Sequence, residues 1–125
     1  MVRQILQDVD RSSGVSAINL AESVDVLVRV FDIQESDVAD AFDLLELGGL
    51  AVIDMDGRTA WRAGMFRARH YQKGSAEISH ADSVAAITAS ARMEALVTSD
   101  RALARVARAA GIEVITIQDQ HGAPH

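Results

Sequence analysis

Short apolar segments alternate with longer helix-patterned segments along the chain, and this alternation most restricts its fold. The expected strands are residues 14–18, 50–55, 95–98 and 112–117. The expected helices are residues 19–31, 35–47, 57–73, 80–93 and 101–110. Strands that alternate with helices pair mostly in parallel and are covered by helices on both faces. The sequence therefore predicts an α/β fold built around a mostly parallel sheet.

Several expected helices carry boundary signals in the sequence. The segment 35–47 is amphipathic, and Gly48 and Gly49 would end it. Asn19 or a neighbour could cap the helix at 19–31, and Gly111 would end the helix at 101–110. The apolar stripe of the 35–47 helix is Val38, Ala41, Phe42 and Leu45. Residues 2–10 are predicted to be the end of a further helix.

Length and composition indicate one globular domain. The chain has 125 residues, of which 49% are hydrophobic, enough for an ordinary core. We expect a single domain over residues 1–117 and a loose tail over residues 118–125. The absence of cysteine excludes disulfides and thiolate zinc sites and favours a reducing cytoplasm. No apolar run reaches the roughly 20 residues that span a bilayer, so no membrane partner is expected.

Charge is distributed unevenly between the two halves of the chain. The formal net charge is −6, which argues against nonspecific adhesion to nucleic acid. Residues 1–56 hold 12 acidic and 3 basic residues, whereas residues 57–125 hold 6 acidic and 9 basic residues. Since no Pro-, Gly- or Ser-rich linker separates the halves, we interpret this as one domain with an uneven surface.

Three acidic residues lie near expected helix starts. Asp100 follows the apolar run of LVTSDRAL, Asp82 lies in SHADSVAAI, and Glu22 follows another short apolar run in INLAES. The simpler interpretation of Asp100 is helix capping, for which Asp is a favoured residue. The functional interpretation is that the three carboxylates converge at one edge of the sheet, where open-sheet folds place their sites.

Converging carboxylates would need a cation. At 4 Å and an effective dielectric near 20, each pair repels by up to ~4 kcal/mol. Oxygen ligands without cysteine or clustered histidine favour Mg²⁺ or Mn²⁺ over zinc. Such a site can activate water and clamp a phosphodiester.

The chain resembles the PIN domain, specifically the toxin ribonucleases of the VapBC type. The resemblance rests on three acidic motifs that occur in the same order, INLAES, SHADSVAAI and LVTSDRAL. The resemblance runs from about residue 4 to residue 117. It implies a PIN-like fold and a metal-dependent ribonuclease that cleaves structured RNA, forms a homodimer and is silenced by a cognate antitoxin protein. Asp82 and Asp100 would be metal ligands, and Glu22 a ligand or the group that orients the attacking water. Thr98 and Ser99 match positions whose hydroxyls can support the site.

One departure from the family's pattern concerns its opening strand, which ends in the first metal-binding Asp. This chain has no such segment, and Asp8 and Asp10 are not assigned that role because they lie in an expected helix. The family's sheet places this strand in the middle, so we expect the chain as given to be a poor or inactive nuclease. The alternative function is a non-catalytic PIN-like module that retains only protein or antitoxin binding.

Basic residues test the RNA interpretation independently. On a helical wheel, Arg58, Arg62, Arg69 and Lys73 fall within about 60° of one another, which suggests an RNA-binding stripe; the alternative is a solvated face. Arg101, Arg105 and Arg108 form a second such stripe, in which Arg101 beside Asp100 is best placed to approach a phosphate or the acids. Trp61 and Tyr71 could stack on bases, but core packing is the favoured interpretation for both.

Overall fold

The chain divides into two compact units in the computed structural model, Met1–Met55 and Asp56–His125. The structure describes residues 13–117, so the predictions for residues 2–10 and for the tail 118–125 lie outside the described residues. The division falls beside the change in charge between residues 56 and 57. The single domain over residues 1–117 stays a prediction. We call residues 1–55 the N-terminal unit and residues 56–125 the C-terminal unit.

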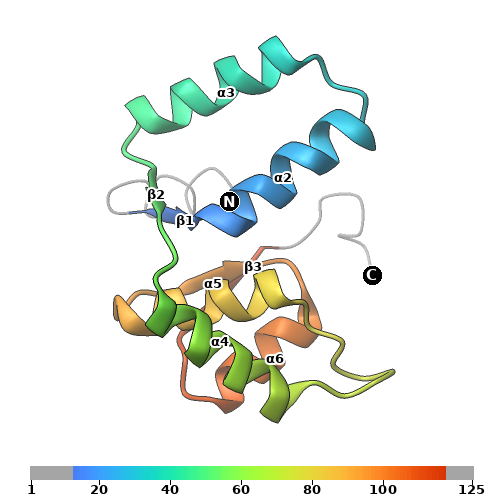
Figure 1. Cartoon of the computed structure of the whole chain (residues 1–125), viewed down its shortest axis with the longest axis vertical. Helices are drawn as coiled ribbons and strands as arrows, with labels where there is room; N and C mark the ends of the chain where they lie inside the picture. Colours follow the sequence, from blue (N-terminus) through green and yellow to red (C-terminus); the bar gives the residue numbers. More distant parts are fainter. Residues whose placement is uncertain (1–12, 118–125) are drawn as a thin grey trace. The chain divides into compact units, whose positions relative to one another are not determined.

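The N-terminal unit contains one pair of parallel strands and two helices (Figure 1). β1 (Gly14–Ser16) pairs with β2 (Ala51–Ile53), and Gly14 lies opposite Ala51. A Cβ atom at Gly14 would meet the end of the Ile53 side chain, so a larger residue here would require that side chain to shift. α2 (Ala17–Arg29) and α3 (Glu35–Leu47) connect the two strands along the chain.

α2 begins earlier than the sequence predicts, and its cap is a different residue. Ser16 is the N-cap: its Oγ accepts the backbone N–H of Asn19 at 3.2 Å. The helix begins at Ala17 directly after β1, which shortens the expected strand 14–18 to three residues. The helix ends at Arg29, whose guanidinium forms an ion pair with Asp25 one turn earlier.

α3 has the bounds that the sequence predicts, Glu35–Leu47. Gly48 is its C-cap, and Gly49 follows with φ of 109°, a left-handed conformation that glycine adopts without steric cost. The expected apolar stripe is only partly covered, because Val38 and Phe42 are half-buried whereas Ala41 and Leu45 are exposed.

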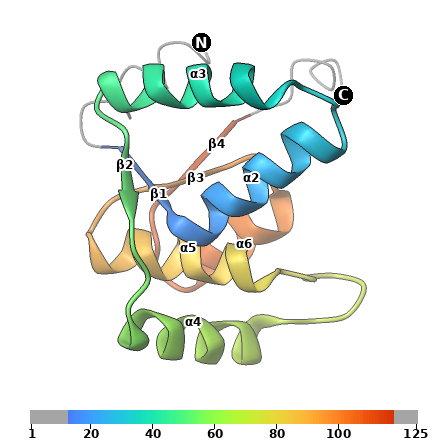
Figure 2. The same ribbon diagram turned by 45° about the horizontal axis from the view of Figure 1, so that its top comes forward.

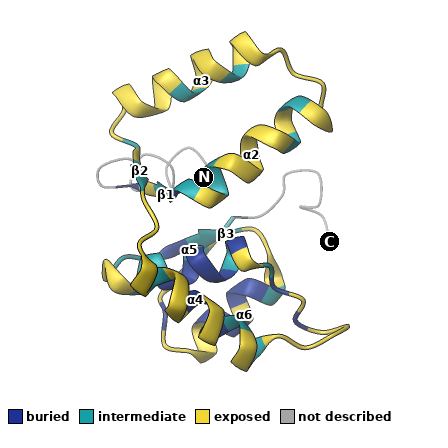
Figure 3. Cartoon of the chain, viewed as in Figure 1, coloured by how far each residue is buried: buried dark blue, intermediate teal, exposed yellow. Residues whose placement is uncertain are grey.

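The C-terminal unit holds the core of the described residues. It consists of α4 (Gly57–His70), α5 (His80–Ala91), β3 (Leu96–Thr98), α6 (Arg101–Ala109) and β4 (Val114–Thr116). β3 and β4 pair in parallel, with Val97 opposite Ile115. α5 lies beside α4, as both views show (Figures 1 and 2), and contacts β3, while α6 packs on both strands. Buried side chains concentrate in α5 and α6 (Figure 3).

Small residues let the helices of this unit approach closely. Ala86 and Ala107 are fully buried at 0% exposure, and Ile78, at 1%, fills the core from the loop before α5. Arg67 of α4 donates from Nε to the carbonyl oxygen of Ile78 at 2.9 Å, which ties that loop to α4. Tight helix contacts of this kind gain dispersion energy that larger side chains would prevent.

Several elements are shorter than the sequence predicts. The expected helix 57–73 ends at His70 because Tyr71 has an extended backbone, and Gln72 and Ala76 then close a turn through two backbone hydrogen bonds. The expected helix 80–93 ends at Ala91. Helix 101–110 ends at Ala109, and the three remaining strands are three residues long each, at 51–53, 96–98 and 114–116. An apolar run does not indicate how many of its residues find a hydrogen-bonding partner.

The predicted α/β class is confirmed. Five helices and short parallel strands make up the described residues, in keeping with a PIN-like fold. The strands form two parallel pairs, β1–β2 and β3–β4, with hydrogen-bond pairing inside each pair. None of the helices within residues 13–117 combines the length and apolar character that crossing a membrane requires.

The capping box at the start of α5 gives a test of what stabilises the C-terminal unit. We expect Ser79→Ala to lower the free energy of unfolding by about 1 kcal/mol, because the first turn of α5 loses the hydroxyl that accepts a backbone N–H. Urea unfolding followed by circular dichroism measures this change. Ser90→Ala on the same helix is the matched control and should leave the stability unchanged or slightly raised. Equal stability of the Ser79→Ala variant and the unmodified chain would contradict the assignment.

Candidate active site and nucleic-acid interface

Asp100 lies between the end of β3 and the start of α6. It is the N-cap of α6, and its Oδ1 accepts the backbone N–H of Leu103 at 3.1 Å. Its own backbone N–H donates to Oγ1 of Thr98 at 3.0 Å. The capping interpretation of Asp100 is therefore correct, and capping uses only one of its two carboxylate oxygens.

Asp82 has a corresponding position in the first turn of α5. Its Oδ2 accepts the backbone N–H of Ser79 at 3.0 Å, and its own N–H donates to Ser79 Oγ at 3.0 Å. These two bonds form a reciprocal capping box. The sequence contains the signal for this capping box, since Ser79 is followed three residues later by an acid. Again one carboxylate oxygen takes part in the cap.

Both aspartates therefore occupy helix N-termini, where backbone N–H groups stabilise a negative charge. Among the described residues, no hydrogen bond reaches Oδ1 of Asp82 or Oδ2 of Asp100. Each side chain thus has one hard oxygen donor available, on a carboxylate whose orientation the cap fixes. This donor chemistry fits Mg²⁺ or Mn²⁺, which proteins bind through one or two carboxylates completed by water and phosphate oxygens.

Glu22 lies in the second turn of α2, in the N-terminal unit, and is exposed. Asp82 and Asp100 belong to the C-terminal unit. Within residues 13–117, no group of three or more His, Cys, Asp or Glu side chains is arranged to hold a metal ion. The three-carboxylate site stays a prediction, as does the role of Glu22 in it.

The predicted supporting residues surround Asp100. Thr98 orients the backbone of Asp100 through its hydroxyl, as described above. Ser99 and Arg101 are exposed, and Arg101 is the first residue of α6. Arg105, one turn further along α6, donates instead to the carbonyl oxygen of Ser75 in the loop before α5. That arginine therefore holds the loop in place.

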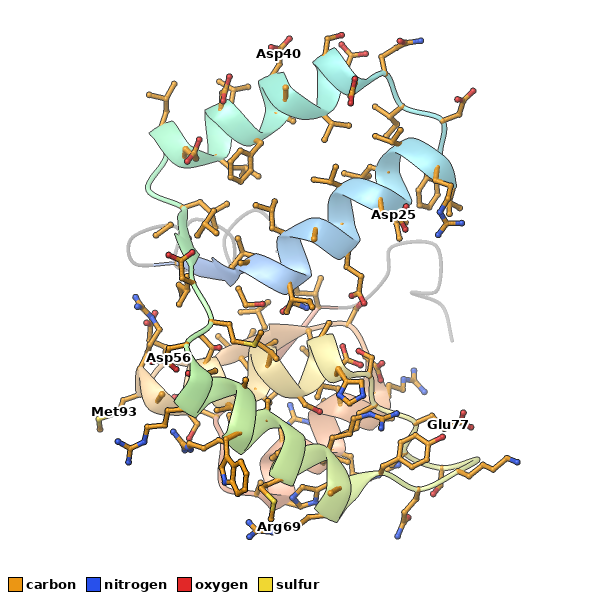
Figure 4. All side chains as sticks on the ribbon, viewed as in Figure 1. Asp25, Asp40, Asp56, Arg69, Glu77 and Met93 are labelled. Carbon is orange, nitrogen blue, oxygen red and sulfur yellow. The ribbon has the colours of Figure 1, made fainter. Side chains whose placement is uncertain are left out.

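The predicted basic stripe is shorter than the sequence suggested. Arg58, Arg62 and Arg69 lie on α4 and are exposed, whereas Lys73 lies beyond the end of the helix, so its place on the stripe was wrong. Figure 4 shows Arg69 projecting outward from α4. Ion pairs among the described residues join Arg29 to Asp25 and Arg92 to Glu94. In this part of the chain, therefore, no carboxylate lies within ion-pair distance of the arginines of the stripe.

Asp56 caps α4 and fixes the start of this basic helix. Its Oδ1 accepts the backbone N–H of Thr59 at 2.8 Å, and this hydrogen bond lowers the pKa of the Asp56 carboxyl below its ordinary value of 3.8. The cap is therefore fully present above pH 3.8 and weakens only as the pH falls through the lowered pKa. The first turn of α4 keeps this cap at neutral pH.

The favoured interpretation of Trp61 and Tyr71 as core residues is wrong. Trp61 is 73% exposed and Tyr71 is 39% exposed. The buried face of α4 is instead formed by Ala63 and Phe66. Tyr71 is covered by the guanidinium of Arg67, which lies 4.5 Å from the ring centroid. The exposed indole of Trp61 thus lies on the same helix as the unneutralised arginines.

Residues 2–109 match the family model of the PIN domain. The chain belongs to the PIN domain family. PIN domains are generally nuclease modules; they usually depend on a divalent metal and typically act on RNA or DNA. The matched span includes all three motif acids, Glu22, Asp82 and Asp100. No curated protein and no solved structure matches the chain.

Substitutions at Asp100 can separate its capping role from its predicted role in metal binding. Asn caps helices as well as Asp does, so Asp100→Asn should change the free energy of unfolding by less than about 0.5 kcal/mol, whereas Asp100→Ala should lower it by about 1 kcal/mol. Both variants should bind Mn²⁺ more weakly than the unmodified chain, as should Asp82→Asn. Electron paramagnetic resonance of free Mn²⁺ measures the affinity.

The control for this titration is Asp43→Asn, which removes one exposed charge from α3. It should bind Mn²⁺ as the unmodified chain does. Equal affinity in the Asp82→Asn, Asp100→Asn and unmodified proteins would exclude these aspartates as ligands.

Proposed function

We propose that this PIN domain is a metal-dependent endoribonuclease of the VapBC toxin type, which cleaves structured RNA in the cytoplasm and is silenced by a cognate antitoxin protein. The observation that carries the proposal is that Asp82 and Asp100 are each fixed at a helix N-terminus with one carboxylate oxygen available. The order of INLAES, SHADSVAAI and LVTSDRAL supports the toxin type and, with it, a homodimer.

The proposed chemistry assigns a separate task to each side chain. Asp82 and Asp100 would hold Mg²⁺ or Mn²⁺, with Glu22 as third ligand or as the group that orients the attacking water. When bound, such a cation lowers the pKa of water and stabilises charge on a phosphodiester. Thr98 fixes the backbone of Asp100, Ser99 would add a second hydroxyl, and Arg101 would contact the phosphate.

RNA binding is assigned to α4. Its arginines, Arg58, Arg62 and Arg69, are exposed and have no carboxylate partner among the described residues. Phosphate contacts by such side chains position RNA without reading its sequence. Lys73 can contribute from the turn that follows α4, although it is not part of the helix.

A non-catalytic PIN-like module is the second candidate function. One observation favours it: residues 13–117 contain no group of three or more potential ligands arranged for a metal ion. Such a module would retain only the binding of an antitoxin or another protein and would not cleave RNA.

A cleavage assay decides between these two functions. We expect structured RNA to be cut slowly in Mg²⁺ or Mn²⁺ by the 125-residue chain, and faster by a version preceded by an apolar segment that ends in Asp, because a further carboxylate holds the cation more firmly. Asp82→Asn in each version is the blank and should abolish cleavage. The absence of cleavage in both versions would support the non-catalytic module.

The salt dependence of RNA binding tests the role of α4. Each lost phosphate contact should lower the slope of log affinity against log salt by roughly 0.7–0.9. We expect Arg62→Ala and Arg69→Ala each to show this loss in metal-free buffer, where no cleavage occurs. Arg92→Ala is the matched control, since Arg92 already pairs with Glu94. An unchanged affinity and salt slope in both α4 variants would show that the basic stripe is a solvated helix face that does not bind RNA.

A further inference from the structure

A hollow of about 290 Å³ opens beside α4 in the C-terminal unit. Its lining comes from α4 and from one residue of α5, so it belongs entirely to this unit. The volume lies at the lower end of the range for small-molecule sites, ~300–1,000 Å³, which suits a single flat ring system better than a larger ligand. The lining includes Trp61, Arg62, Phe66, Arg69, His70 and Ile87.

The hollow combines an apolar floor with an exposed aromatic wall. Phe66 and Ile87 are 6% and 7% exposed and belong to the core, and the ring of Phe66 lies 4.6 Å from that of His70. Trp61 is 73% exposed and does not contribute to the buried face of α4. The core therefore does not require an indole at position 61, and its broad face remains available to a ligand.

The same hollow carries two positive charges. Arg62 and Arg69 both line it, and neither has a carboxylate partner within residues 13–117. An indole beside free guanidinium groups matches a nucleotide, whose base stacks on an aromatic ring while its phosphates contact cations. An acidic protein would satisfy the arginines but would leave the stacking surface unused.

We propose that this hollow binds one unpaired base of single-stranded RNA, stacked on Trp61, while Arg62 and Arg69 contact the flanking phosphates. The inference rests on the RNA-binding role proposed for α4 and deepens it by naming the form of RNA that this surface recognises. Loops and bulges of a structured RNA present such unpaired bases, whereas a continuous duplex keeps its bases stacked.

Trp61 is the only tryptophan in the sequence, so its fluorescence reports directly on the hollow. Three oligonucleotides serve as probes in metal-free buffer: a single-stranded RNA, an abasic strand with the same number of phosphates, and an RNA duplex. We expect the single strand to quench Trp61 and the other two to leave its emission almost unchanged, because only the first offers an unpaired base. Equal quenching by the abasic strand would overturn the proposal.

Substitutions at Trp61 test stacking through affinity, measured by fluorescence anisotropy of labelled RNA. Trp61→Leu keeps an apolar side chain but removes the ring, and should weaken binding of the single strand by roughly 5- to 150-fold, the value expected for loss of one stacked base. Trp61→Phe should recover part of the loss. Met93→Leu, at an exposed residue outside the hollow, is the control and should bind as the unmodified chain does.

The outcomes separate this inference from the proposed function. If Trp61→Leu binds the single strand as tightly as the unmodified chain, while Arg62→Ala still lowers the salt slope, the stacking proposal is wrong and RNA binding by α4 stands. If the unmodified chain binds none of the three probes, both proposals fail. If Trp61 emission changes with protein concentration and not with RNA, the hollow is a protein-binding surface and the stacking proposal is wrong.

Discussion

The hydrogen bonds by which Asp82 closes the capping box of α5 and Asp100 caps α6 are the constraint on which both the C-terminal unit and its proposed chemistry depend. A helix start leaves backbone N–H groups without partners, and Asp82 and Asp100 each satisfy one of them. The same bonds fix the direction in which the remaining carboxylate oxygens point. Capping and metal binding are therefore compatible, because each uses a different oxygen of the same side chain.

The sequence predicts the end of a helix correctly where residues next to that end determine it. α3 has its expected bounds because Gly48 and Gly49 end it through backbone conformations that the chain itself determines. α4 is shorter than expected because Tyr71 has an extended backbone and a tight turn between Gln72 and Ala76 reverses the chain; Arg67 then binds the returning chain at the carbonyl oxygen of Ile78. Helical periodicity alone contains no information about such a turn.

The same distinction applies to the candidate site. Asp82 and Asp100 could be found from the sequence because their motifs combine a helix start with an acid. The exposure of Trp61 could not be read from its hydrophobicity, although Ala63 and Phe66 recur at the spacing of a buried helix face and leave the indole outside it. Arg105 has the spacing of a surface stripe, yet it binds Ser75, thirty residues away in the chain.

The net charge of −6 argues against nucleic-acid binding only if acidic and basic residues are evenly distributed along the chain. In this chain they are not. The acidic excess lies before residue 57, whereas the residues from 57 onward have three more basic than acidic side chains. Electrostatic attraction to a phosphate is screened over roughly 8–10 Å at ordinary ionic strength. Acidic residues that lie farther than this from a phosphate at α4 therefore have little effect on it, and no carboxylate of the described residues lies within ion-pair distance of the α4 arginines. We therefore expect the local charge of α4, rather than the net charge of the chain, to govern the proposed binding of RNA.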